Sequence, residues 1–414
     1  MGRKKCVQGN STPPTNISAF RDEERRWKSR LAAPDLSLAF DADNIAWDSL
    51  MTAGRLRGIW TSGSGATEEC WRVDLDELAE LGGLLGQSRW KGKQRQGEND
   101  YAIIIRACTN SSLRAGFVFF PRVLSESFQR DLVGETLCHA GQPNLTSLDN
   151  HYTLPPGGLW NAWKEGRGDE LVWRKRSATS TDAAPSDAAP AAARDQERAP
   201  SESCIDKDPA ATTVGDLLPK LRWANVGWHY NWTTKLYEFE RGQPPLPPLI
   251  YSCCRTLARS MPWQHAYPDL RHACDDPAAS PPRPDWQRWK EAYEPDAGIV
   301  NFYQLKDSLT SHVDLAEVDA VSPLVSLSLG HSSVFLIGGT TRDVPPLPVL
   351  LRSGDALIMS GAGRRAYHAL PRVLEGTLPD YLRADAAEAD PEWGLYGEYL
   401  ERGARINVNV RSVF

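Results

Sequence analysis

Short apolar segments separated by turns fill the second half of the chain and limit the folds open to it. Residues 324–329 alternate in polarity, and apolar side chains fill 334–337, 349–351 and 356–359. Glycine-containing turns such as 353–355 separate these segments. No helical pattern intervenes, so we expect an antiparallel barrel or sandwich rather than alternating strands and helices.

One long segment lacks the side chains that a packed core needs. Residues 177–203 contain no Val, Ile, Leu, Met or aromatic residue and are rich in Ala, Pro, Ser and Asp. Such a segment buries too little apolar surface to offset the entropy lost on ordering. We therefore predict a disordered insert over 177–216.

Charge and cysteine usage narrow the class of protein. The 47 basic and 53 acidic residues give a net charge of −6, so any contact with nucleic acid must be local. The eight cysteines form no CxxC pair, which indicates reduced thiols. No secretory leader or long apolar run occurs, so we expect an intracellular protein that does not contact membranes, in the cytoplasm, nucleus or mitochondrion.

A His-x-Asp sequence is the first motif with chemical content. In a strand, His312 and Asp314 point to the same face and offer an imidazole beside a carboxylate. Two histidines and one carboxylate with open coordination positions are typical of non-haem Fe(II) oxygenases. The third ligand would be His331 or His368, and we favour His368 because the distal histidine of jelly-roll oxygenases lies on a late strand. The alternative is a hydrogen-bonded surface pair.

The last strand pattern indicates an anion site. Arg405, Asn407, Asn409 and Arg411 alternate with aliphatic residues, so they share one face. If that face is exposed, the pattern is ordinary. If it lines an interior, the guanidinium groups require an anion, and a dicarboxylate suits them because arginine binds carboxylates with two parallel hydrogen bonds.

Several motifs occur together in the region from residue 301 onward. They are Asn301-Phe302-Tyr303, His312-Val313-Asp314, Gly338-Gly339 with Arg342, Ser353-Gly354-Asp355, His368 and Arg405-x-Asn407-x-x-x-Arg411. This set resembles the AlkB-type Fe(II)/2-oxoglutarate-dependent dioxygenases. Residues 220–223, 226–232 and 358–361 are most similar to the branch of the first eukaryotic AlkB homologue, a nucleic acid dioxygenase branch.

The resemblance implies a mainly β fold, a double-stranded β-helix (jelly-roll) barrel with an α+β lid. It covers 217–414, and more faintly 116–163. The implied domains are an N-terminal extension of unknown role (1–115), the start of the catalytic domain with a nucleotide-recognition lid (116–176), the insert (177–216) and the dioxygenase barrel (217–414).

The resemblance also implies roles for individual residues. Fe(II) would be held by His312, Asp314 and His368. Arg405 would bind the distal carboxylate of 2-oxoglutarate, and the rest of that site would be Asn301, Tyr303, Asn407 and Arg411. Residues at substrate-contacting positions of the family are Trp160, Trp228, His229, Tyr230 and Arg342.

The implied reaction is oxidative demethylation of a nucleic-acid base with 2-oxoglutarate and O2, releasing formaldehyde, succinate and CO2. The substrate would be N1-methyladenosine in tRNA, N6-methyladenine in DNA or a methylated cytosine, and we expect a monomer. Two alternatives stay open. The barrel could be a non-catalytic binding module for nucleic acid or protein, or a dioxygenase acting on a protein such as a histone tail.

Aromatic residues crowd the start of the expected barrel. Trp223, Trp228, Tyr230 and Trp232 fall within ten residues, and an enzyme that acts on a base must hold it between aromatic surfaces. For Trp223 and Trp232 we favour a core position. Basic pairs such as Arg364-Arg365 could contact phosphates, although such pairs are more often solvated.

Overall fold

A computed structural model describes residues 18–76, 81–85, 101–106, 116–175, 211–267, 285–314, 316–319, 321–386 and 392–414. Within these ranges, no helix is both long and apolar enough to cross a membrane.

The largest β-sheet is antiparallel and has ten strands, which lie in the order β1-β2-β3-β4-β5-β17-β14-β19-β12-β9. Its strands are β1 (Ile45–Trp47), β2 (Leu56–Thr61), β3 (Thr67–Asp74), β4 (Tyr101–Arg106), β5 (Phe117–Phe120), β9 (Trp223–Gly227), β12 (Ala297–Tyr303), β14 (Leu324–Gly330), β17 (Ala356–Met359) and β19 (Arg405–Arg411). The C-terminal β19 lies in the interior of the sheet, paired with β12 and β14 along its whole length.

A four-stranded antiparallel sheet carries the remaining strands of the C-terminal half. Its order is β13 (Leu309–His312), β18 (His368–Val373), β15 (Ser333–Ile337) and β16 (Leu347–Leu351). From β12 to β19 the chain crosses repeatedly between the two sheets, because β12, β14, β17 and β19 belong to the larger one.

The strands expected at 324–329, 334–337, 349–351 and 356–359 are confirmed as β14 to β17. The closed barrel is not seen, because no described strand pairs with both sheets. The smaller sheet ends at the short β13, whose register with β18 shifts between Leu309 and His312. The architecture of the described residues is therefore mixed, with open antiparallel sheets and helices on the outside.

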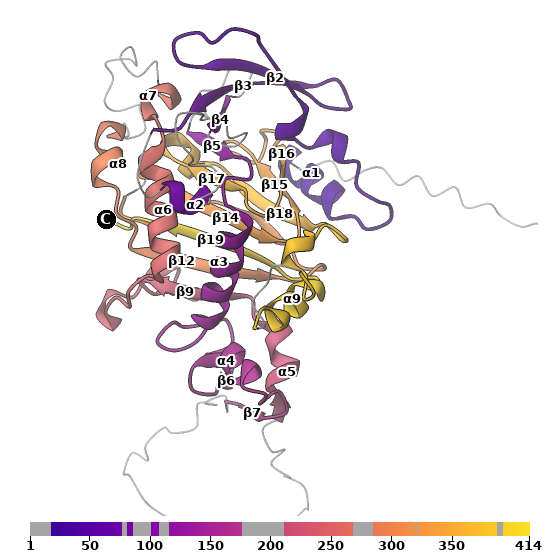
Figure 1. Cartoon of the computed structure of the whole chain (residues 1–414), viewed down its shortest axis with the longest axis vertical. Coiled ribbons are helices and arrows are strands. Elements are labelled where there is room, and N and C mark those ends of the chain that lie inside the picture. The colour runs from indigo at the N-terminus through magenta and orange to yellow at the C-terminus, as the bar shows by residue number, and fades with distance from the viewer. Residues whose placement is uncertain are drawn as a thin grey trace, which may run out of the picture.

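Helices cover the outer face of each sheet (Figure 1). On the large sheet, side chains of α3 (Glu126–Cys138) and α6 (Pro248–Ser260) share a core with Leu327 and Val408. On the small sheet, Phe20 and Trp27 of α1 (Ala19–Lys28) pack against Val334 and Ala369. The remaining helices are α2 (Leu81–Leu85), α4 (Gly158–Lys164), α5 (Val214–Leu217), α7 (Trp263–Ala266), α8 (Trp286–Ala292) and α9 (Trp393–Glu401).

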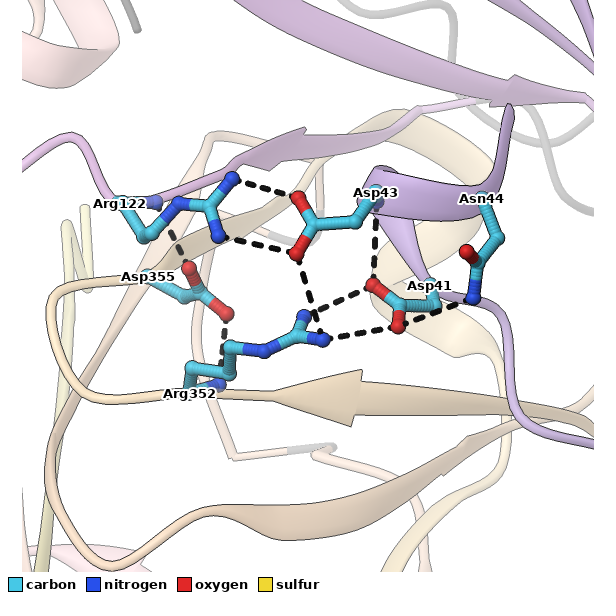
Figure 2. A network of polar contacts seen from close by, with 6 residues as sticks. All are labelled: Asp41, Asp43, Asn44, Arg122, Arg352 and Asp355. Atoms are coloured by element: carbon cyan, nitrogen blue, oxygen red, sulfur yellow. Dashed lines mark hydrogen bonds and ion pairs between the residues drawn. The ribbon is translucent and has the colours of Figure 1, made fainter. Parts of the chain in front are cut away.

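The N-terminal segment, expected to be an extension, continues the large sheet through β1 to β4. A polar network, which we call the N-terminal clasp, ties it to the loops of the C-terminal half (Figure 2). Both terminal nitrogens of Arg352 lie 2.8 Å from the carboxylate oxygens of Asp41, and Arg122 pairs with Asp43. The backbone N–H groups of Arg352 and Arg122 donate to Asp355 at 2.6 Å and 2.7 Å. Residues 18–76 are thus joined to the sheet that carries β14 and β19.

The segment expected to be an insert lies mostly outside the described residues, except for 211–216. Those residues form β8 (Ala211–Thr213) and the start of α5. β8 pairs with β7 (Leu171–Arg174), which also pairs with β6 (Tyr152–Thr153). Trp173 faces Ala211 across this pair, so the described residues on the two sides of 176–210 lie next to each other in one small sheet. In Figure 1 this sheet lies at the opposite end of the molecule from the β2–β3 hairpin.

Candidate metal centre and cosubstrate pocket

Three side chains that could bind a metal meet at one end of the small sheet. His312 ends β13, His368 begins β18, and the two residues face each other across the strand pair. Asp314 follows two residues after His312. One ligand atom from each of the three residues lies within 4.8 Å of the other two. The structure thus groups His368, and not His331, with the His-x-Asp pair.

The hydrogen bonds of the two imidazoles fix which nitrogen is free. His312 Nδ1 lies 2.9 Å from the carbonyl oxygen of Thr310, and His368 Nδ1 lies 3.1 Å from that of Ala366. A carbonyl oxygen only accepts, so each Nδ1 carries the proton and donates it. In the neutral form of each imidazole, Nε2 then keeps the lone pair that a metal-binding imidazole requires.

The carboxylate is held in its charged form. Burial acts to raise the pKa of Asp314, but Arg411, His368 and His312 outweigh it and hold that pKa well below its ordinary value. Burial, together with the neighbouring His312, lowers the pKa of His368 to about 4, so this imidazole is neutral at physiological pH. An anionic carboxylate and neutral imidazoles are the protonation states in which these groups bind Fe(II). The donor set therefore fits this metal.

A pocket between the sheets opens beside the three residues. The polar face expected for 405–411 points into this pocket, since Asn407, Asn409 and Arg411 line it. Ile406, Val408 and Val410 lie in the core on the other face. The other lining residues are Trp232, Ile299, Asn301, Tyr303, Leu309, His312, Asp314, Leu324, Ser326, Phe335, Leu357, Met359, His368 and Leu370.

Arg405 supplies an uncompensated cation next to this pocket. Its side chain is fully buried and lies opposite Tyr303 in the β12–β19 pair. It donates to the His331 carbonyl oxygen at 2.9 Å and to Ser328 Oγ at 2.8 Å, whereas its Nε has no partner. Among the described residues no carboxylate forms an ion pair with Arg405, and burial lowers its pKa to about 10. A buried guanidinium in this state is suited to bind a carboxylate ligand.

Arg411 and Asn407 differ from Arg405, because their polar atoms already have protein partners. Arg411 forms an ion pair with Glu317 at 2.7 Å and approaches Asp314 at 3.7 Å. The amide nitrogen of Asn407 donates to Ser326 Oγ and to the Leu327 carbonyl oxygen, both at 2.9 Å. The strand alternation predicted these positions but not their partners.

Of the expected substrate residues, Trp228, His229 and Tyr230 lie in the turn and hairpin that follow β9. The Tyr230 ring contacts Trp232, with centroids 5.1 Å apart, and the negative charge of Asp314 adds to burial in raising the pKa of Tyr230. Trp228 stacks edge-on against Phe239 at 5.1 Å. His229 is buried, and its Nδ1 has no partner. Tyr230 thus packs against Trp232, which lines the pocket beside the candidate metal centre, and Trp228 lies two residues before Tyr230.

Arg342 contacts the residues that precede His312 and His368. Its guanidinium donates to Ser311 Oγ and to the Ser311 carbonyl oxygen at 3.3 Å, and it lies 4.6 Å from the ring centroid of Tyr367. Ser311 precedes His312 and Tyr367 precedes His368. The expected position beside the active centre is therefore consistent with its contacts.

The structure does not bring Trp160 to the pocket, and we correct that assignment. Its side chain is fully buried in α4, where it packs against Trp163, Tyr396 and Tyr399. An indole enclosed by three aromatic rings offers no free face to a base. Its role is to fill the core beneath α4.

Two further interpretations change. Trp232, for which we favoured a core position, lines the pocket, and its indole nitrogen has no partner. Arg364, considered as a phosphate contact, is 1% exposed and pairs with Glu317 at 3.3 Å. The crowding of aromatics near 230 was a usable signal for Trp232, whereas no sequence signal marked Glu317.

Comparison with known proteins agrees with this geometry. Residues 184–411 match the model of the 2OG-Fe(II) oxygenase superfamily. The chain belongs to this superfamily. Its cofactor is Fe(II), with 2-oxoglutarate and O2 as cosubstrates, so the cofactors expected from the sequence are confirmed.

Relatives place the chain near the AlkB homologues, as the motifs indicated. It is 30% identical over 308 residues to the DNA N(6)-methyladenine demethylase ALKBH1A of Arabidopsis thaliana, covering 73% of this chain and 76% of the relative. It is 30% identical to the human nucleic acid dioxygenase ALKBH1, covering 72% of this chain and 64% of that protein. It is 32% identical to the tRNA demethylase abh1 of Schizosaccharomyces pombe, covering 65% and 69%. A solved structure, that of OsALKBH1, aligns over 73% of this chain and 99% of its own, with a TM-score of 0.39 and 18% identity.

Proposed function

We propose that this chain oxidatively demethylates nucleic-acid bases. The observation that carries the proposal is the grouping of His312, Asp314 and His368 beside a pocket, with Arg405 next to it, a buried arginine that forms no ion pair with a described residue. Relatives named as DNA and tRNA demethylases support nucleic acid as the substrate class.

The protein residues would bind and orient the reactants. When bound, Fe(II) with 2-oxoglutarate and O2 supplies the oxidation that converts an N-methyl group into a hydroxymethyl group, with release of succinate and CO2. His312, Asp314 and His368 would hold the metal through two Nε2 atoms and one carboxylate. The hydroxymethyl group then leaves as formaldehyde, and a proton takes its place on the base nitrogen.

Arg405 would bind the distal carboxylate of 2-oxoglutarate through its open guanidinium edge, with Tyr303 beside it. Burial raises the pKa of Tyr303, so its hydroxyl keeps the proton and can donate to that carboxylate. Asn301, Asn407 and Arg411 would border the rest of the cosubstrate.

The aromatic residues in and just before the hairpin of β10 (Tyr230–Asn231) and β11 (Leu236–Tyr237) would hold the base. Trp228 and Tyr230 would form its walls, with His229 and Arg342 close by. Trp232 joins this group because it lines the pocket itself. We further propose that the strands β12 to β19 correspond to the double-stranded β-helix of the family, since the chain crosses repeatedly between two sheets that together line the pocket.

Mass spectrometry of nucleosides tests the proposal and identifies the substrate. Total tRNA and genomic DNA are incubated with Fe(II)-loaded protein, 2-oxoglutarate and O2. We expect one methylated nucleoside to decrease with wild-type protein and to persist with Asp314→Ala, which lacks one ligand. Asp380→Ala is the matched control, because the Asp380 side chain is 96% exposed. Persistence of every modified base with the wild type, while a methylated peptide is demethylated, would contradict the proposal.

A further inference from the structure

Glu317 connects two buried arginines next to the candidate active centre. Its side chain is 3% exposed, and its carboxylate lies 2.7 Å from Arg411 Nε and 3.3 Å from Arg364 Nη2. Arg364 also donates to the Ser322 carbonyl oxygen at 2.8 Å. Burying an unpaired charge costs free energy, so the position of the Glu317 carboxylate determines the positions of both guanidinium groups.

A tyrosine from another element completes this group. The hydroxyl of Tyr237 lies 3.0 Å from Arg411 Nε, which donates to it, and the same hydroxyl donates to Glu317 at 3.3 Å. Burial raises the pKa of Tyr237 to about 12, so the hydroxyl keeps its proton and remains a donor. Tyr237 therefore contacts both members of the Glu317–Arg411 ion pair.

Tyr237 belongs to the hairpin of β10 (Tyr230–Asn231) and β11 (Leu236–Tyr237), which carries the aromatic residues beside the pocket. It faces Tyr230 across the hairpin, with ring centroids 5.5 Å apart, and stacks with Phe239 at 6.1 Å. Any shift of this hairpin moves the Tyr237 hydroxyl relative to Glu317 and Arg411.

Arg411 connects this group of buried polar residues to the candidate metal centre and to the pocket. Arg411 lines the pocket, and its Nη1 lies 3.7 Å from Asp314. Glu317 follows Asp314 by three residues, and Arg365 Nη1 donates to the Asp314 carbonyl oxygen at 3.3 Å. The loop that carries Asp314 and Glu317 thus meets the aromatic hairpin at the guanidinium of Arg411.

We infer that Glu317 and Tyr237 are positioning residues that couple 2-oxoglutarate binding to nucleic-acid binding. When 2-oxoglutarate fills the pocket beside Arg411, it holds the guanidinium in one position. The guanidinium then holds the Tyr237 hydroxyl, and with it the hairpin that receives the base. Coupling of this kind is reciprocal, so a bound base strengthens cosubstrate binding by the same factor. This inference rests on the proposed function.

Binding without turnover tests the coupling. The dissociation constant of 2-oxoglutarate is measured by calorimetry on Mn(II)-loaded protein without O2, alone and with a saturating methylated oligonucleotide. We expect the oligonucleotide to tighten wild-type binding by about fivefold or more, a typical coupling. In Tyr237→Phe this ratio of the two dissociation constants should fall to about one. Glu317→Gln should reduce both the ratio and the affinity, because Arg411 loses its charged partner.

The control variant is Tyr381→Phe, which removes a 3.0 Å tyrosine hydrogen bond to Gln129 away from the site. It should keep the wild-type ratio, and thermal unfolding shows whether each variant is folded. A Tyr237→Phe protein that is folded and keeps the full ratio would overturn the inference. Wild-type protein that binds 2-oxoglutarate but no nucleic acid would instead contradict the proposed function.

Discussion

Arg405 is the residue whose environment most directly indicates a ligand. Its charge is buried without an ion pair among the described residues, and its Nε lacks a partner. We predict that Arg405→Gln weakens 2-oxoglutarate binding by about tenfold to hundredfold, because a charge-assisted hydrogen bond contributes roughly 1.5–3 kcal/mol. Calorimetry on the Mn(II)-loaded protein measures this change.

The matched control is Arg402→Gln, since Arg402 is exposed and lies over the ring of Trp163. Its cosubstrate affinity should equal that of the wild type. Equal affinities for Arg405→Gln and Arg402→Gln would show that the cosubstrate carboxylate is bound elsewhere.

Site residues that recur at a regular spacing along a strand could be predicted from the sequence. Site residues without such a spacing could not. Arg405 to Arg411 alternate in β19, so a period of two located them. The same period predicted that His312 and Asp314 lie together, and they do, although β13 ends at His312 and Asp314 follows the strand. Glu317 and Arg364 follow no such rule, because a lone Glu or Arg is usually exposed and only the fold buries this pair. Trp160 was misassigned for a related reason, since the sequence does not distinguish a tryptophan of a core from one of a pocket.

At the scale of elements, the strands of the C-terminal half were predictable because glycine turns separate short apolar segments. The N-terminal strands were not predicted. In β3 only Cys70 and Val73 are buried, and charged residues fill much of the remainder. A strand with so few buried positions shows little alternation of apolar and polar residues in its sequence. Its hydrogen bonding to β2 and β4 stabilises it as a strand.

The pairing of β7 with β8 predicts how the chain tolerates loss of the insert. Replacing 178–208 by a short Gly/Ser linker should leave Tm within about 2 °C of the wild type, because loop length changes closure entropy only slowly. Differential scanning calorimetry measures this. Removing 211–213 as well should lower Tm, since β7 then loses one of its two neighbouring strands. A fall of more than about 5 °C for the first deletion would contradict the prediction.

At the scale of the whole molecule, the N-terminal clasp joins segments far apart in the chain (Figure 2). Arg352 and Asp41 form a bidentate pair whose side chains are 28% and 12% exposed. We predict a coupling energy of about 1–3 kcal/mol for this pair, from a double-mutant cycle of Arg352→Ala and Asp41→Ala in urea unfolding.

The exposed pair Arg383–Asp380, whose side chains are 44% and 96% exposed, provides the comparison. Its coupling energy should be about 0.5 kcal/mol or less, because water screens it. Equal values for the two pairs would mean that the clasp adds nothing to the attachment of the N-terminal segment.

We propose that the whole molecule uses this pocket and 2-oxoglutarate to oxidise a methyl group on a nucleic-acid base. The most direct test is the ratio of succinate to formaldehyde produced by Fe(II)-loaded protein with a methylated oligonucleotide. We predict that the oligonucleotide stimulates succinate formation, with one formaldehyde for each additional succinate, and that Asp314→Ala forms neither. Wild-type succinate formation that equals the Asp314→Ala background, with no formaldehyde, would contradict this activity.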